Sequence, residues 1–107
     1  MEIRQYDIYW ISLDPAVGGE IKKTRPCIVI SPDEMNYHLK TILIAPITST
    51  IRSIPFRVKL FIKGKPSMIA LDQIRAVDKA RFQNKLTEAD KETVGKLKQI
   101  IHEMLVK

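Results

Sequence analysis

The sequence has 107 residues, of which 45% are hydrophobic and 28% are charged. This balance predicts a single globular domain over residues 1–107 and argues against an intrinsically disordered chain. No apolar run approaches the roughly 20 residues of a membrane span, and the first residues lack the pattern of a secretory signal. Cys27 is the only cysteine, so we expect a buried, inert thiol in a cytoplasmic protein with no membrane partner.

The positive charge is concentrated in the middle of the chain. The net charge is +6, but residues 22–85 carry thirteen Lys or Arg against four acidic residues, a net charge of +9. Residues 1–21 have a net charge of −3, and residues 86–107 sum to zero. A basic face of this kind favours a polyanion such as nucleic acid as the partner. The alternative is a charged surface that only keeps the protein soluble.

Short strands dominate the predicted secondary structure. Runs of β-branched and aromatic residues predict strands over residues 7–13, 27–31, 42–47, 56–62, 67–71 and 73–77. Pro46 lies within the third of these runs, which indicates a strand edge or a bulge.

Two polar loops and two tight turns connect the predicted strands. The loops cover residues 15–24 and 33–41, and the first is longer than a hairpin needs. Residues 63–66 are predicted as a turn, and residues 78–82 as a short helical turn capped by Asp78.

One helix is predicted at the C-terminal end. Thr87-Glu-Ala-Asp90 has the pattern of a helix N-terminus. One face of this helix is apolar and is expected to pack on the core: Val94, Leu97, Ile101, Met104 and Leu105. Five or six strands with one terminal helix predict a mainly β fold, a small barrel whose open side the helix covers.

Arg25 lies where a mobile loop meets a strand that must be buried. Gly18 and Gly19 make the loop flexible, and the apolar run from Cys27 to Ile30 makes the strand rigid. Such a junction can hold a charged group still against a ligand, although the arginine can equally close a strand end. Thr48 is the first of three hydroxyl residues that end another buried strand.

The sequence lacks the residue patterns of most hydrolytic sites. His38 and His102 are the only histidines, and nothing in the sequence brings them together. We find no zinc-ligand spacing, no carboxylate pair suited to two metal ions and no phosphate-binding glycine loop. We therefore expect no metal and no cofactor. Catalysis would need a substrate that carries its own nucleophile, as RNA does in its 2′-hydroxyl.

A series of short motifs follows one another along most of the chain. They are Asp7-Ile-Tyr-Trp, Leu13-Asp-Pro, Gly18-Gly-Glu, Thr24-Arg-Pro, Val29-Ile-Ser, Ala45-Pro-Ile-Thr, Leu71-Asp-Gln-Ile-Arg and Asp78-Lys-Ala-Arg. Each motif is weak by itself, but in this order and spacing they resemble the MazF/PemK family of toxin endoribonucleases.

The resemblance implies both a fold and an activity. The fold is an SH3-like small barrel, of the CcdB/MazF/PemK-like kind, that forms a homodimer. The activity is metal-independent, sequence-selective cleavage of single-stranded RNA, inhibited by a cognate antitoxin. We expect the antitoxin to present an acidic, poorly ordered segment to the basic face, and any DNA binding to occur only through the antitoxin.

The resemblance also assigns residues. Arg25 and Thr48 occupy the positions of the main catalytic pair, and Glu20 that of an accessory loop residue. Some members use an aspartate at the position of Asp72 with an arginine two residues earlier, but Ala70 stands there in this chain. Residues expected to contact RNA are Lys22, Lys23, Arg52, Asp72 and Gln73. The general base stays open between Glu20 and Asp72, because a guanidinium does not deprotonate.

Two other functions fit the same pattern. A non-catalytic nucleic-acid-binding barrel would keep the basic face without needing Arg25 beside Thr48. A gyrase-poisoning toxin of the CcdB type would share the fold, but those toxins end in Trp-Gly-Ile, whereas this chain ends in Leu105-Val-Lys.

Overall fold

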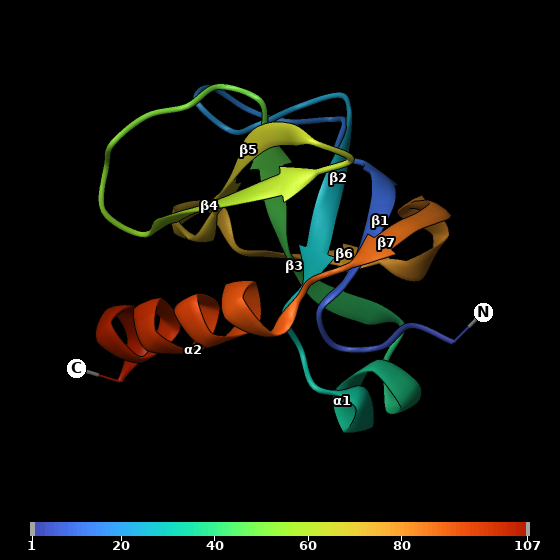
Figure 1. The fold of residues 1–107 in the computed structure, drawn as a ribbon. Coiled ribbons are helices and arrows are strands. Elements are labelled where there is room, and N and C mark those ends of the chain that lie inside the picture. The colour runs from blue at the N-terminus through green and yellow to red at the C-terminus, as the bar shows by residue number, and fades with distance from the viewer. Residues whose placement is uncertain (1, 107) are drawn as a thin grey trace.

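An antiparallel sheet forms the body of this computed structural model, which describes residues 2–106. Seven strands pair in the order β4-β5-β3-β2-β1-β7, with β6 beside β3. They are β1 (Asp7–Ser12), β2 (Thr24–Val29), β3 (Thr41–Thr48), β4 (Arg57–Ile62), β5 (Lys65–Ala70), β6 (Arg75–Asp78) and β7 (Phe82–Glu88). The sheet curls into a half-barrel (Figure 1), which confirms the predicted mainly β fold class.

Helix α2 (Lys91–Leu105) closes one side of the curled sheet (Figure 1). Its Leu97 is fully buried in a core cluster with residues of the sheet, among them Ile8, Ile28 and Val58. Ile101 and Met104 pack against the same cluster. The prediction that Leu105 also packs on the core is wrong, because this last residue of the helix is 66% exposed. The predicted position of the helix over the open side of the barrel is therefore confirmed. None of the helices within residues 2–106 has the length and apolar character needed to cross a membrane.

The central strands are buried on both faces. In β1, Ile8 belongs to the cluster beneath α2, whereas Tyr9 and Ile11 belong to a second cluster on the opposite face. In β3, Ile44 and Ala45 divide between the two clusters in the same way. Successive side chains of a strand point to opposite faces, so the unbroken apolar run of β3 fills both.

Pro46 lies where β3 changes its neighbours. Residues 41–44 of β3 pair with β6, and residues 47–48 pair with β5. Pro46 itself is opposite Cys27 of β2. Proline has no backbone N–H to donate, so it fits at a point where the ladder on one side is interrupted.

The prediction of a polar loop over residues 33–41 is wrong in its first part. Residues Asp33–His38 form helix α1 and Asn36 is its only buried residue. The Asn36 side chain donates to the backbone carbonyl of Ser31 at 2.9 Å, so a polar group holds the helix in place. A helix anchored by an asparagine shows no apolar periodicity, and the sequence pattern therefore missed it.

The predicted start of the terminal helix at Thr87 is also wrong. Thr87 and Glu88 are the last residues of β7, opposite Ile8 and Asp7 of β1. The helix begins at Lys91, and the Asp90 side chain accepts a hydrogen bond from the Thr93 backbone at 2.8 Å. Strand β7 was not predicted because most of its side chains are exposed and polar, so it lacks an apolar run.

Other boundaries differ in ways that matter for the site. Strand β2 begins at Thr24 rather than Cys27, so Arg25 belongs to the strand itself. Gln73 ends the 3₁₀ turn η1 (Leu71–Gln73) and is outside β6. The β4–β5 turn is the pair Lys63-Gly64, both with positive φ, as two-residue hairpins favour. The predicted turn capped by Asp78 is confirmed as η2 (Lys79–Arg81).

The Asp90 cap gives a pH-dependent contribution to stability. Hydrogen bonds from the Thr93 backbone and side chain hold the pKa of Asp90 below its ordinary value. The carboxylate therefore stabilises the fold above its unfolded-state pKa, and this contribution is lost as the pH falls through the lowered folded-state value. Asp90→Asn keeps a capping side chain that does not titrate. We expect thermal melting between pH 7 and pH 2 to show a smaller acid destabilisation in this variant than in the wild type. An unchanged pH dependence would contradict the role of the charged cap.

Candidate active site

A pocket of about 460 Å³ opens beside the ends of β2 and β3. Its lining combines basic, hydroxyl and apolar side chains: Trp10, Thr24, Arg25, Pro26, Ile47, Thr48, Ser49, Ile62, Lys63, Lys65, Ser67 and Leu86. Two of the predicted site residues, Arg25 and Thr48, line this pocket together. The pocket is therefore the candidate active site.

Antiparallel pairing explains why Arg25 and Thr48 meet. Cys27 of β2 is opposite Pro46 of β3. Arg25 and Thr48 each lie two residues beyond this last pair of the β2–β3 ladder, Arg25 near the start of β2 and Thr48 at the end of β3. The start of β2 and the end of β3 lie at the same end of the sheet, where loops leave it (Figure 1). A rigid core thus positions two side chains that are far apart in the sequence.

The polar atoms of this pair are oriented by nearby backbone groups. Arg25 Nε donates to the carbonyl oxygen of Lys22 at 3.3 Å, which directs the two terminal nitrogens of the guanidinium away from that contact. Thr48 Oγ1 accepts a hydrogen bond from the backbone N–H of Thr50 at 3.2 Å. Since the hydroxyl accepts there, its own hydrogen is available to a ligand.

The electrostatic character of the pocket suits an anion. Arg25, Lys63 and Lys65 line it, and no carboxylate does. Trp10 is 37% exposed, so its ring is accessible from the pocket side. A guanidinium matches the oxygens of a phosphate in two-point geometry, and an exposed aromatic ring can stack on a base. The lining therefore fits a phosphate and an adjoining base better than a neutral solute.

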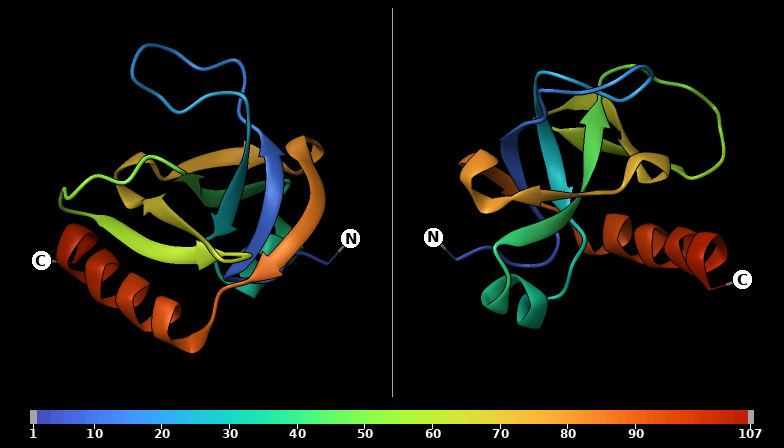
Figure 2. Two further views of the ribbon diagram at one scale, coloured as in Figure 1. Left: turned by 45° about the horizontal axis from the view of Figure 1, so that its top comes forward. Right: turned by 180° about the vertical axis from the view of Figure 1, so that it is seen from behind.

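Glu20 lies outside the pocket lining. It is exposed near the tip of the β1–β2 loop, and its carboxylate accepts a hydrogen bond from the Val17 backbone at 2.6 Å. Figure 2 shows this loop projecting from the sheet. Lys22 and Lys23 follow on the returning part of the loop, and Arg52 is exposed on the loop between β3 and β4.

The Asp72 carboxylate, in η1, accepts hydrogen bonds from an arginine of strand β4. Arg57 Nε donates to one carboxylate oxygen of Asp72 at 3.1 Å, and a terminal nitrogen of Arg57 donates to the other at 3.2 Å. Arg57 is opposite Ala70 across the β4–β5 pair. The guanidinium that binds Asp72 therefore comes from the cross-strand neighbour of Ala70.

Gln73 also contacts the chain itself. Its side-chain oxygen accepts a hydrogen bond from the backbone N–H of Ile21 at 2.8 Å. Neither Gln73 nor Asp72 lines the pocket that contains Arg25 and Thr48.

Sequence reasoning did not select Trp10, Lys63 or Lys65. Trp10 fits equally well into a buried strand. The two lysines flank Gly64 in what was identified only as a turn. The sequence feature that could have indicated these lysines is a pair of cations beside a predicted turn. Nothing in the local sequence indicates that this hairpin folds toward Arg25.

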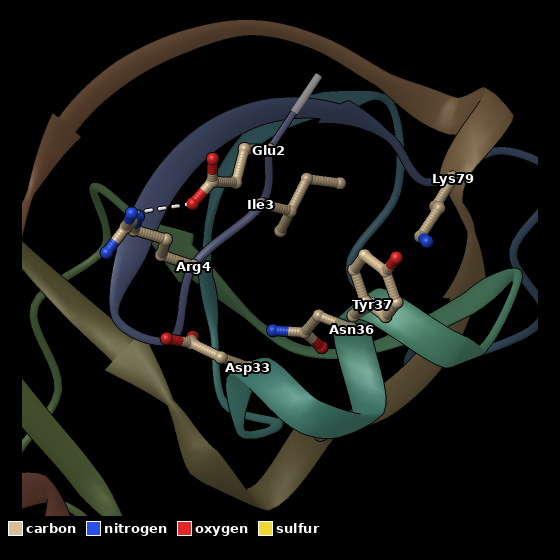
Figure 3. Close-up of a pocket in the computed structure, with 7 residues that line it drawn as sticks. All are labelled: Glu2, Ile3, Arg4, Asp33, Asn36, Tyr37 and Lys79. Atoms are coloured by element: carbon tan, nitrogen blue, oxygen red, sulfur yellow. Dashed lines mark ion pairs between the residues drawn. The ribbon is translucent and has the colours of Figure 1, made fainter.

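A larger pocket of about 620 Å³ lies elsewhere, between α1 and the N-terminal segment (Figure 3). It is lined by Glu2, Ile3, Arg4, Asp33, Asn36, Tyr37 and Lys79. Glu2 and Arg4 form an ion pair at 2.6 Å, and the lining has as many acidic as basic residues. Size alone therefore does not make it the better candidate for a polyanion.

The single cysteine has no part in this chemistry. Cys27 is fully buried in the core cluster opposite α2. Burial raises the pKa of its thiol to about 12, although the nearby Arg75 charge acts in the other direction. The predicted buried thiol is therefore confirmed, and it stays protonated at neutral pH.

Known proteins share both the sequence pattern and the fold. The family model described as "PemK-like, MazF-like toxin of type II toxin-antitoxin system" matches residues 4–105. The chain is 34% identical to Endoribonuclease EndoA of Bacillus subtilis (strain 168) in an alignment that covers 94% of this chain and 92% of that protein.

Two solved structures show the same fold. MazF from Deinococcus radiodurans has a TM-score of 0.87 at 24% identity and covers 100% of this chain and 99% of its own. An endoribonuclease in complex with its cognate antitoxin, from Mycobacterial species, has a TM-score of 0.82 at 19% identity, covering 97% of this chain and 95% of its own.

The curled antiparallel sheet with a terminal helix is the fold of these MazF structures. The chain belongs to the family of PemK-like, MazF-like toxins of type II toxin–antitoxin systems, which confirms the family and the endoribonuclease class predicted from its sequence.

Proposed function

We propose that the protein is a metal-independent endoribonuclease that cleaves single-stranded RNA, including mRNA, at selected sequences. A single domain over residues 1–107 would act in the cytoplasm and use no cofactor. The observation that carries this proposal is the convergence of Arg25 and Thr48 in a pocket lined by three cations and no carboxylate. Family membership and the endoribonuclease relative support the same substrate class.

The chemistry begins with the RNA 2′-hydroxyl. Its oxygen attacks the adjacent phosphorus, the bond to the 5′-oxygen breaks, and the products carry a 2′,3′-cyclic phosphate and a 5′-hydroxyl. Charge grows on the non-bridging oxygens as the attack proceeds. The terminal nitrogens of Arg25 and the Thr48 hydroxyl can donate to those oxygens, and such donors stabilise the transition state more than the ground state.

Proton transfer needs a further group. Glu20 accepts from the Val17 backbone at 2.6 Å, and both oxygens of Asp72 accept from Arg57. Of the two, Glu20 belongs to the loop whose returning end leads into Arg25. We propose that Glu20 assists this proton transfer and reaches the pocket when the β1–β2 loop closes over RNA. We propose that Asp72 contacts RNA.

The RNA backbone would follow the basic side chains around the pocket. Lys63 and Lys65 line it, and Lys22, Lys23 and Arg52 are exposed on the two neighbouring loops. Contacts of this type position the strand without reading its sequence. A base next to the cleaved phosphate would stack on Trp10.

We further propose a homodimer that a cognate antitoxin inhibits. One solved relative is an endoribonuclease in complex with its cognate antitoxin, and another structure is a MazE–MazF complex from Deinococcus radiodurans. The net charge of +9 over residues 22–85 is suited to an acidic, poorly ordered antitoxin segment. Any DNA contact would come through that antitoxin.

Incubation of the purified protein with a mixed RNA pool in EDTA tests the proposal. We expect cleavage at a defined sequence, with 2′,3′-cyclic phosphate and 5′-hydroxyl ends. Products with 3′-hydroxyl and 5′-phosphate ends would overturn the scheme, since they imply attack by water. Inhibition of gyrase without RNA cleavage would favour the CcdB-type alternative, and RNA binding with neither activity would favour a non-catalytic barrel.

Thr48 is expected to contribute one hydrogen bond to the charge that develops in the transition state. We expect Thr48→Ala to lower kcat about a hundredfold, the usual scale for one lost donor to a developing charge. Thr48→Ser retains the hydroxyl and should lose less. Thr41, an exposed threonine at the opposite end of β3, provides the matched control as Thr41→Ala. Equal activity of Thr48→Ala and the control would remove Thr48 from the mechanism.

Antitoxin binding should depend strongly on salt. An acidic segment on a basic face is attracted over a distance that shrinks from about 10 Å at 0.1 M salt to about 3 Å at 1 M. Titration of the antitoxin peptide by calorimetry at these two concentrations should show a clear loss of affinity. Affinity that does not change with salt would show that apolar contacts alone hold the complex.

A further inference from the structure

Two sequence motifs of the family lie outside the pocket lining yet contact the loop beside it. They are Leu71-Asp-Gln-Ile-Arg and Asp78-Lys-Ala-Arg, which span η1, β6 and η2. Their side chains reach back to the β1–β2 loop, residues 13–23. This loop supplies Glu20 and the two lysines of the proposed RNA path.

Arginines from these motifs hold the outgoing end of the loop. Arg75 donates to the carbonyl oxygen of Leu13 at 3.3 Å. Arg81 donates to the carbonyl oxygen of Ser12 at 3.3 Å and also to that of Asp14. Both guanidiniums thus bind the backbone where β1 ends, and hydrogen bonds from charged donors are the stronger ones.

Gln73 holds the returning end. Its side-chain oxygen accepts from the backbone N–H of Ile21 at 2.8 Å. The next residue, Lys22, offers its carbonyl oxygen to Arg25 Nε at 3.3 Å. One continuous series of contacts therefore joins Gln73 to the guanidinium through two consecutive loop residues.

We propose that Gln73 is a positioning residue for the cleavage reaction, which orients the Arg25 guanidinium by fixing the backbone of Ile21 and Lys22. This inference rests on the proposed function, because it assigns a task within that active site. It also gives Gln73 a different role from the direct RNA contact predicted from the sequence.

Kinetics with three substitutions separate these roles. Gln73→Met keeps the length of the side chain but removes the acceptor, whereas Gln73→Glu keeps an oxygen that can accept from Ile21. Gln99→Met, at an exposed position on α2, makes the same chemical change away from the site. The substrate is an RNA oligonucleotide that contains the mapped cleavage sequence.

We expect Gln73→Met to lower kcat about tenfold while KM changes less than twofold. Gln73→Glu should retain kcat within about twofold of the wild type, and Gln99→Met should have no effect. Amide hydrogen exchange provides a readout without RNA: the Ile21 N–H should be protected in the wild type, exposed in Gln73→Met and protected again in Gln73→Glu.

Several results would overturn the assignment. An unchanged kcat in Gln73→Met excludes a positioning role. A raised KM with unchanged kcat in both variants means that the amide binds RNA directly. If Gln73→Met does not fold, Gln73→Asn, one methylene shorter, takes its place. A wild type that cuts no RNA would refute the proposed function instead, whereas fast exchange of the wild-type Ile21 N–H would refute the anchor alone.

Discussion

Arg25→Ala should abolish nearly all RNA cleavage, with a fall in kcat of about a thousandfold or more, the scale of lost arginine contacts in phosphoryl transfer. The reason is the position of the guanidinium. Arg25 is one of three cations that line the pocket with Thr48, and it lies within strand β2 of the central sheet. Of the two lysines, Lys63 lies in the β4–β5 turn and Lys65 is the first residue of β5.

Arg25→Lys should recover little of this loss. A lysine supplies the charge but not the planar fork that reaches two phosphate oxygens at once. It also loses the orienting contact to the Lys22 carbonyl oxygen, which Arg25 makes through Nε. Single-turnover cleavage of a labelled RNA oligonucleotide measures both variants.

An arginine far from the pocket provides the control. Arg4 is exposed and pairs with Glu2 in the second pocket (Figure 3). Arg4→Ala and Arg4→Lys should leave the cleavage rate near that of the wild type. If Arg25→Lys were as active as the wild type, the two-point geometry would be wrong and only the charge would matter.

The sequence predicted the class of the fold because its core pattern is local. Strands β1 and β3 and the apolar face of α2 each carry their burial pattern within a few residues. Helix α1 and strand β7 carry no such pattern, since a buried asparagine fixes one and β7 exposes most of its side chains. Elements of this kind are defined by their partners in three dimensions, which a periodicity does not reveal.

The candidate site likewise combines residues that the sequence pattern predicted with residues that it did not. Arg25 and Thr48 were selected from ordered motifs, and the antiparallel pairing of β2 with β3 brings together the strand ends that carry them. Lys63 and Lys65 were missed because their hairpin reaches the pocket through tertiary folding.

The ion pair between Arg57 and Asp72 was not predicted from the sequence. Ala70 departs from the pattern that the resemblance implies, but in the sheet Arg57 lies opposite Ala70 and pairs with Asp72. Arg57 and Asp72 belong to different elements, β4 and η1, so their pairing becomes visible only in three dimensions.

The second large effect on cleavage is expected when the proposed nucleophile, the RNA 2′-hydroxyl, is removed. A single 2′-deoxynucleotide at the cleaved position should abolish cleavage, because it removes the attacking oxygen while leaving the phosphate in place. Binding should change little, since the lining offers donors and cations to the phosphate and an aromatic ring to a base. Trp10 is the only tryptophan of the chain, so its fluorescence reports binding directly at the pocket.

The deoxy substrate therefore separates binding from chemistry in one experiment. We expect it to change Trp10 fluorescence when it binds, and to inhibit cleavage of normal RNA competitively. A 2′-deoxynucleotide placed three positions away serves as the matched control and should be cut. Cleavage of the deoxy substrate at its modified position would require water or a protein side chain as nucleophile, and would overturn the proposed role of the 2′-hydroxyl.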